Sequence, residues 1–131
     1  MRILNLIFLT ILSSVTLLQN TFTSNTIDKN ENIVGEWIID LRPSPDADPY
    51  LQTFTVVVQN EKNFVGSFYG SPVENTSLNN SWDKLYFAFK SSDSTHEYYQ
   101  SGYIVGEEIF GTTFCPGRNF VMPWSGKKKK K

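Results

Sequence analysis

After residue 30 the chain alternates short β-prone runs with turn residues, and no stretch spaces its apolar residues as an amphipathic helix does. Large apolar residues occupy every second position of the clearest run, as Leu85, Phe87 and Phe89 do. Because the side chains of a strand point alternately to its two faces, this spacing predicts strands with one buried face. Eight runs share this character: 33–41, 51–59, 63–70, 73–79, 84–91, 97–105, 108–114 and 119–125.

The connections between these runs are short, apart from the segment 42–50. Short connections join antiparallel neighbours, whereas a parallel pair needs a crossover of about a dozen residues or more. Three prolines stiffen 42–50 and disfavour a helix there. The pattern therefore predicts a sheet whose strands run alternately up and down.

A chain of 131 residues has room for one domain, which we place at 33–126. For this domain we predict an all-β fold, an antiparallel up-and-down barrel of about eight strands. Barrel closure removes the exposed edges that such a β-prone chain would otherwise present. A two-sheet sandwich is the alternative.

The N-terminus has the pattern of an export signal. A basic start precedes an apolar run over 3–18, and a polar segment with small residues at possible cleavage positions follows. As a helix, this run is shorter than a bilayer core of about 30 Å. We therefore expect a signal peptide at 1–23, a disordered lead at 24–32, and a secreted or periplasmic mature protein with no membrane span. An uncleaved N-terminal anchor is the alternative.

The charges of the mature chain are unevenly distributed. Residues 25–126 hold six basic side chains against all 13 acidic ones, and five lysines follow at 127–131. We expect 127–131 to form a solvated basic tail. Since the domain carries no basic stripe, nucleic acid is not an expected partner.

The residue types on which catalysis and metal binding depend are scarce. The single His96 and single Cys115 exclude a disulfide framework and most zinc clusters. No nucleophile elbow or comparable motif is present. Asp46-Ala47-Asp48 resembles part of a calcium loop but lacks its glycine and distal glutamate. We expect no enzyme activity, no cofactor and no metal site.

Three short motifs resemble those of calycins, the small barrels that include lipocalins and avidins. They are Gly35-Glu36-Trp37 in the first run, the segment 64–70 around Gly66, and Trp124 in the last run. The resemblance implies a closed barrel in which Trp37 plugs one end, Gly35 packs closely beside it, and Trp124 has a structural role.

Two positions depart from the avidin pattern. Ile39 and Phe68 stand where avidins carry a polar residue and a tyrosine that contact biotin. Lipocalins also carry an arginine near the last strand, and this sequence has no arginine that clearly corresponds to it. The resemblance therefore implies an architecture but no ligand.

Strand parity assigns each connection to one end of the predicted barrel. The long segment 42–50 shares its end with 71–72, 91–96 and 115–118. Small barrels that bind ligands do so at an open mouth. We therefore predict a site for a small apolar or aromatic ligand at this end, with these candidate residues: Arg42, Asp46, Asp48, Tyr50, His96 and Arg118.

Two further expectations concern the same end. Closure between the first and last strands predicts that Arg118 lies near Asp40, Asp46 or Asp48. The alternative to ligand binding is a structural or protein-interaction domain with a filled interior, because eight strands leave little space beyond their own side chains. The partner is then another protein.

Overall fold

The computed structural model describes residues 31–131. The expected signal peptide and all but the last two residues of the expected lead lie outside this part of the chain. No helix within 31–131 is long and apolar enough to cross a membrane.

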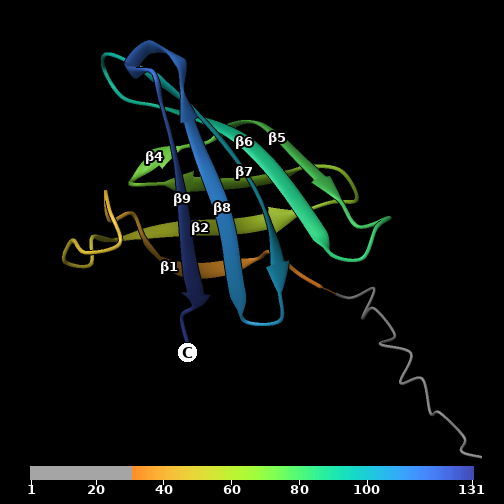
Figure 1. Cartoon of the computed structure of the whole chain (residues 1–131). Helices are drawn as coiled ribbons and strands as arrows, with labels where there is room; N and C mark the ends of the chain where they lie inside the picture. The colour runs from red at the N-terminus through yellow and green to blue at the C-terminus, as the bar shows by residue number, and fades with distance from the viewer. Residues whose placement is uncertain (1–30) are drawn as a thin grey trace, which may run out of the picture.

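The described chain forms one antiparallel sheet in the order β4-β3-β2-β1-β9-β8-β7-β6-β5 (Figure 1). Its strands are β1 (Gly35–Asp40), β2 (Leu51–Gln59), β3 (Phe64–Phe68), β4 (Ser71–Pro72), β5 (Glu74–Asn79), β6 (Leu85–Ser92), β7 (Glu97–Val105), β8 (Glu108–Cys115) and β9 (Phe120–Lys128), with a short 3-10 helix η1 (Pro116–Arg118) before β9. The predicted up-and-down barrel is confirmed, and the sandwich alternative is wrong.

The sheet curls until its two ends meet. In the middle of the strand order the first and last strands pair, with Asp40 opposite Ser125. The two ends of the sheet meet where β3 lies beside β5, and we call this place the seam. There, Thr76 Oγ1 of β5 accepts a hydrogen bond from the backbone N–H of Phe64 at 3.1 Å and donates one to the carbonyl of Phe64 at 2.7 Å. Leu78 of β5 also donates its backbone N–H to the carbonyl of Lys62 at 2.7 Å. These few bonds take the place of a regular ladder between β3 and β5, and the barrel is nearly closed.

The structure has nine strands instead of about eight because the chain changes partner within 71–79. Ser71–Pro72 pairs with β3, whereas Glu74–Asn79 pairs with β6. Asn75 has a φ of 50° at the irregularity in the β5–β6 register. The predicted strand 73–79 therefore corresponds to β5, and the ninth strand, β4, lies in the predicted connection 71–72.

The C-terminal strand also extends further than expected. β9 runs to Lys128, so two lysines of the expected tail lie in the sheet, where Lys127 pairs with Ile38 and Lys128 with Trp37. Lys129 donates its backbone N–H to the carbonyl of Glu36 at 2.8 Å. The solvated tail is shorter than 127–131.

Aromatic side chains fill the middle of the barrel, and inward glycines give them room. The rings of Phe54 and Phe89 stack with centroids 4.9 Å apart. A Cβ at Gly111 would lie 2.2 Å from the indole of Trp124 and one at Gly102 2.8 Å from the ring of Phe87. Any larger residue at these two positions would displace the core.

One end of the barrel, which we call the sealed end, is closed by the segment 31–37. Ile33 and Trp37 are fully buried there, and the indole N–H of Trp37 donates to the carbonyl of Ile33 at 2.8 Å. The carboxylate of Glu31 accepts the backbone N–H groups of Leu85 and Gly106, at the ends of two different connections. The last residues of the expected lead are therefore a plug.

Candidate functional site

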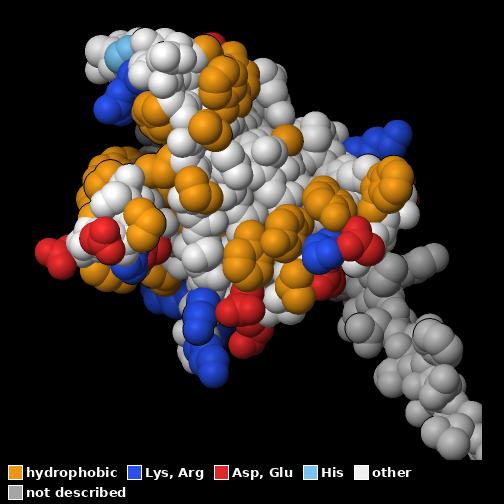
Figure 2. Space-filling view, in the orientation of Figure 1, with side chains coloured by type: hydrophobic (Ala, Val, Ile, Leu, Met, Phe, Trp, Pro, Cys, Tyr) orange, Lys and Arg blue, Asp and Glu red, His pale blue; other side chains and the backbone are white. Residues whose placement is uncertain are grey.

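The opposite end, which we call the rim, gathers four connections: 41–50, 69–70, 93–96 and 116–119. A cavity of about 390 Å³ opens between them, and we call it the rim cavity. In Figure 2 the molecule is hollowed between the β1–β2 loop and the rim ends of β8 and β9. This volume falls within the range of about 300–1,000 Å³ that is common for small-molecule sites.

Apolar side chains form the walls of the rim cavity, and polar ones form its floor. The walls consist of Leu41, Phe68, Phe120 and Met122. The floor consists of Ser91, Gln100 and Thr113, which are all at least nine-tenths buried. A few buried polar groups among apolar walls are what orients a ligand in a typical small-molecule site.

The floor is held by a hydrogen-bond network that centres on the Gln100 side chain. Its Oε1 accepts the hydroxyl of Thr113 at 2.6 Å and the indole N–H of Trp124 at 3.1 Å. Its Nε2 donates to Ser91 Oγ over 3.4 Å. These bonds explain how a core built mainly of aromatic and aliphatic side chains accommodates a glutamine.

A second network lies at the mouth, where Asp93 closes the β6–β7 connection. Its carboxylate accepts the phenol of Tyr98 at 2.7 Å and the backbone N–H groups of Thr95 and His96. These bonds, that of Tyr98 foremost, hold the pKa of Asp93 well below its usual range. The same bond raises the pKa of Tyr98. Asp93 is therefore an ionised structural anchor.

Arg118 supplies a cation at the mouth. Its Nη1 donates to the phenol oxygen of Tyr98 over 3.4 Å, and its guanidinium lies 5.1 Å from the ring centroid of Phe120. The bond to Tyr98 raises the pKa of Arg118, so the charge persists at every ordinary pH. Both contacts leave other guanidinium N–H groups facing solvent, since the side chain is exposed.

Two tyrosines stand on the other side of the mouth. The hydroxyls of Tyr50 and Tyr69 are hydrogen-bonded, and each side chain is about half exposed. Tyr69 occupies the β3–β4 turn with a φ of 54°, followed by Gly70 at 80°. A positive φ is unusual for a tyrosine, and glycine or asparagine is the usual residue in such a turn. Tyr69 adopts this conformation in the turn, and its aromatic ring therefore lies at the mouth.

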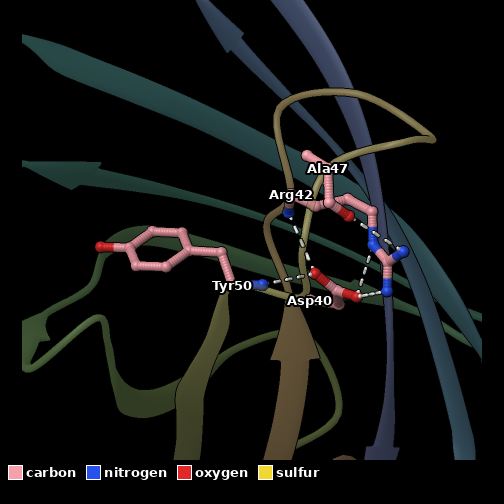
Figure 3. A network of polar contacts seen from close by, with 4 residues as sticks. All are labelled: Asp40, Arg42, Ala47 and Tyr50. Carbon is pink, nitrogen blue, oxygen red and sulfur yellow. Dashed lines mark hydrogen bonds and ion pairs between the residues drawn. The ribbon is translucent and has the colours of Figure 1, made fainter.

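The long β1–β2 loop is fixed by an ion pair at its base (Figure 3). Asp40 Oδ2 accepts Arg42 Nε at 2.8 Å, and Asp40 Oδ1 accepts the backbone N–H of Tyr50 at 3.0 Å. Arg42 Nη1 reaches the carbonyl of Ala47 at 3.4 Å. The hydrogen bond from Arg42 lowers the pKa of Asp40. The ring of Tyr50 points away from this pair, which positions the tyrosine at the mouth.

The structure brings together only part of the residue set predicted from the sequence. Tyr50 and Arg118 line the rim cavity, whereas Arg42, Asp46, Asp48 and His96 do not. The guanidinium of Arg42 is used in holding its own loop.

Three of the predicted residues lie elsewhere on the rim. Asp46 and Asp48 are exposed on the long loop. His96 Nδ1 is hydrogen-bonded to the hydroxyl of Thr95 at 2.8 Å, and the ring lies close to Gly117. Neither aspartate nor the histidine contributes to the lining of the cavity.

The expected position of Arg118 near Asp40, Asp46 or Asp48 needs correction. Asp40 pairs with Arg42, and Arg118 bonds to Tyr98 instead. An arginine two residues away on the same loop reaches Asp40 more easily than one from the end of the last connection.

Sequence reasoning missed the floor of the cavity. Gln100 lies in the run 97–105 at the same parity as Gly102 and Ile104, which face the core. A polar residue at a position that faces the core, as Gln100 does, could have indicated a buried polar site. Ser91 gives the same indication, because it is a polar residue at the inward parity of the run 84–91.

The chain matches no family model, no curated protein and no solved structure at a significant level. The barrel itself is consistent with a calycin-like fold. Within residues 31–131, no group of three or more His, Cys, Asp and Glu side chains is placed to hold a metal ion. Cys115 is a buried free thiol.

Proposed function

We propose that the protein is an exported, calycin-type binding module whose rim cavity takes a small apolar or aromatic ligand. The observation that carries this proposal is the rim cavity itself, with apolar walls over a buried polar floor. Burial of about 150 Å² of ligand surface against such walls contributes roughly 4 kcal/mol before the costs of association. Because association itself costs at least a comparable amount, contacts of the ligand with the polar floor and the mouth must add to this term.

The arrangement supports binding more than catalysis. The acidic residue that lines the rim cavity, Asp93, has a lowered pKa and accepts four hydrogen bonds, so it is a weak general base. Arg118 and the phenols of Tyr50, Tyr69 and Tyr98 are groups that orient a ligand.

Native mass spectrometry of protein purified from its natural host tests the proposal. We expect a retained small-molecule adduct in the wild type. Met122→Trp places an indole inside the rim cavity and should abolish the adduct, because Met122 lines it. The matched control is Val121→Trp, since Val121 is the preceding residue of β9 and is exposed on the outer face. An adduct that survives Met122→Trp would contradict the proposal.

A protein-interaction role is the second candidate, and the outer face of the barrel favours it. Tyr99, Phe114 and Val121 are cross-strand neighbours on β7, β8 and β9, and all three are exposed. Figure 2 shows hydrophobic side chains over the rim ends of β8 and β9 and a second group across β6–β8. On β7 and β8, the cross-strand neighbours Tyr103 and Phe110 stack with ring centroids 5.2 Å apart.

The two candidates are separated by where a substitution acts. Phe114→Ser changes the outer face and should leave adduct formation intact under the first proposal. Loss of a co-purifying protein from Phe114→Ser, with no small-molecule adduct in the wild type, would favour the second.

A further inference from the structure

The orientation of the Gln100 amide is determined by its partners. An indole N–H can only donate, so the Gln100 atom 3.1 Å from Trp124 Nε1 must be the oxygen. The single hydroxyl hydrogen of Thr113 is donated to the same oxygen, over 2.6 Å. The Gln100 amino group therefore faces the other way, toward Ser91.

This orientation leaves donors on the floor of the rim cavity. The amino group of Gln100 has two N–H bonds, and one of them meets Ser91 Oγ over a long 3.4 Å. Ser91 accepts that bond, and its own hydroxyl donates no side-chain hydrogen bond within the described part of the chain, residues 31–131. Both residues are more than nine-tenths buried and line the cavity. A buried donor without a good acceptor is costly, so this floor favours an occupant that supplies one.

We propose that the ligand of the rim cavity carries a neutral hydrogen-bond acceptor, such as a carbonyl oxygen, and inserts it first so that it meets Gln100 and Ser91. This inference rests on the proposed function and names the chemical class of the ligand, an aromatic or aliphatic carbonyl compound. The acceptor is neutral because the floor is built of amide and hydroxyl groups, and burial of a bare charge against neutral donors is costly. The cation of Arg118 lies at the exposed mouth, where it can meet only the trailing end.

Three probes of similar size test this inference by isothermal titration calorimetry. They are 2-acetylnaphthalene, which has the carbonyl, 2-isopropylnaphthalene, which lacks it, and 2-naphthoate, which is charged. We expect 2-acetylnaphthalene to bind about ten-fold more tightly than 2-isopropylnaphthalene, the effect of one or two buried hydrogen bonds. The 2-naphthoate anion should bind more weakly than the ketone.

Variants locate the effect. Ser91→Ala and Gln100→Met should each bring the affinity ratio of ketone to hydrocarbon toward one. Ser101→Ala is the matched control, because Ser101 follows Gln100 on β7 and is exposed on the outer face. Since Gln100→Met also removes the partner of Trp124 and Thr113, Ser91→Ala remains decisive if Gln100→Met fails to fold.

The outcomes distinguish failure of the inference from failure of the proposed function. Equal affinity of ketone and hydrocarbon in the wild type would overturn the acceptor-first inference and leave the binding module in place. Tighter binding of 2-naphthoate, lost in Arg118→Ala, would also overturn it, because the polar end would then sit at the mouth. No binding of any of the three probes would count against both.

Discussion

The two ends of the barrel are built from the same strands, yet their inward side chains differ. On β7, Ile104 and Gly102 face the core toward the sealed end, whereas Gln100 lies on the floor of the rim cavity. On β6, Leu85 lies at the sealed end and Ser91 at the rim. The same strands thus contribute to both ends, and on β6 and β7 the inward side chains change from apolar at the sealed end to polar at the rim.

This difference separates stability from recognition. Ile33 and Trp37 of the sealed end are fully buried, so their burial stabilises the fold. At the rim, Tyr50 and Tyr69 remain about half exposed over a cavity. Substitutions at the sealed end should therefore lower the free energy of unfolding, and substitutions at the mouth should lower ligand affinity.

The largest expected effect is at the sealed end. Trp37→Ala removes a fully buried indole that is also hydrogen-bonded to Ile33, and should reduce the free energy of unfolding by about 3–5 kcal/mol in urea titrations. Trp82→Ala is the control, since Trp82 is 70% exposed. A loss under about 1 kcal/mol for Trp37→Ala would show that the two ends do not differ in this way.

A smaller effect is expected on the floor of the rim cavity. Thr113→Val keeps the size of the side chain but removes its 2.6 Å hydrogen bond to Gln100, which should cost about 1 kcal/mol. Thr112→Val, at the exposed neighbouring position, should change stability little. Equal losses in urea titrations of the two variants would mean that the floor network does not stabilise the barrel.

The rim should respond to acid through Asp93. Its hydrogen bonds lower its pKa in the folded state, so the stability that they provide is present above the unfolded value of about 4 and is lost as pH falls below it. The melting temperature of Asp93→Asn should lie below that of the wild type at pH 7, and the gap should narrow below about pH 4. A gap that stays constant from pH 7 to pH 3 would contradict this assignment.

The smallest effect on stability is expected at Arg118, which is exposed and bonded to Tyr98. Arg118→Ala should leave the melting temperature nearly unchanged. Where the trailing end of a ligand carries an acceptor, its affinity should fall, because Arg118 offers directed donors at the mouth. A marked drop in melting temperature would make Arg118 a structural residue.

The local alternation of residues predicted most of the fold. The run 84–91 differs from β6 by one residue at each end, because period-two alternation is a property of one strand alone. The pairing of the predicted connection 71–72 with β3, before the chain passes to β6 as β5, could not be predicted in this way, since it depends on the partner strands.

The candidate site could be predicted only in part for a related reason. Parity placed Tyr50 and Arg118 at the rim, where both line the cavity. Arg42 forms an ion pair with Asp40 because of the path that the proline-rich loop takes, and the composition of the loop does not specify that path. Gln100 was visible as a polar residue at an inward position, but its partners Thr113 and Trp124 come from two other strands.

The central claim is that the rim binds and the sealed end does not, and side-chain N–H resonances in a titration with 2-acetylnaphthalene test it most directly. The indole N–H of Trp124 donates to Gln100 Oε1 at the floor of the rim cavity, where the Gln100 amino group faces Ser91, whereas the indole N–H of Trp37 is bonded to Ile33 at the sealed end. We predict saturable shifts of the Trp124 and Gln100 signals and an unchanged Trp37 signal. Saturable shifts of the Trp37 signal with fixed Trp124 and Gln100 signals would contradict the account.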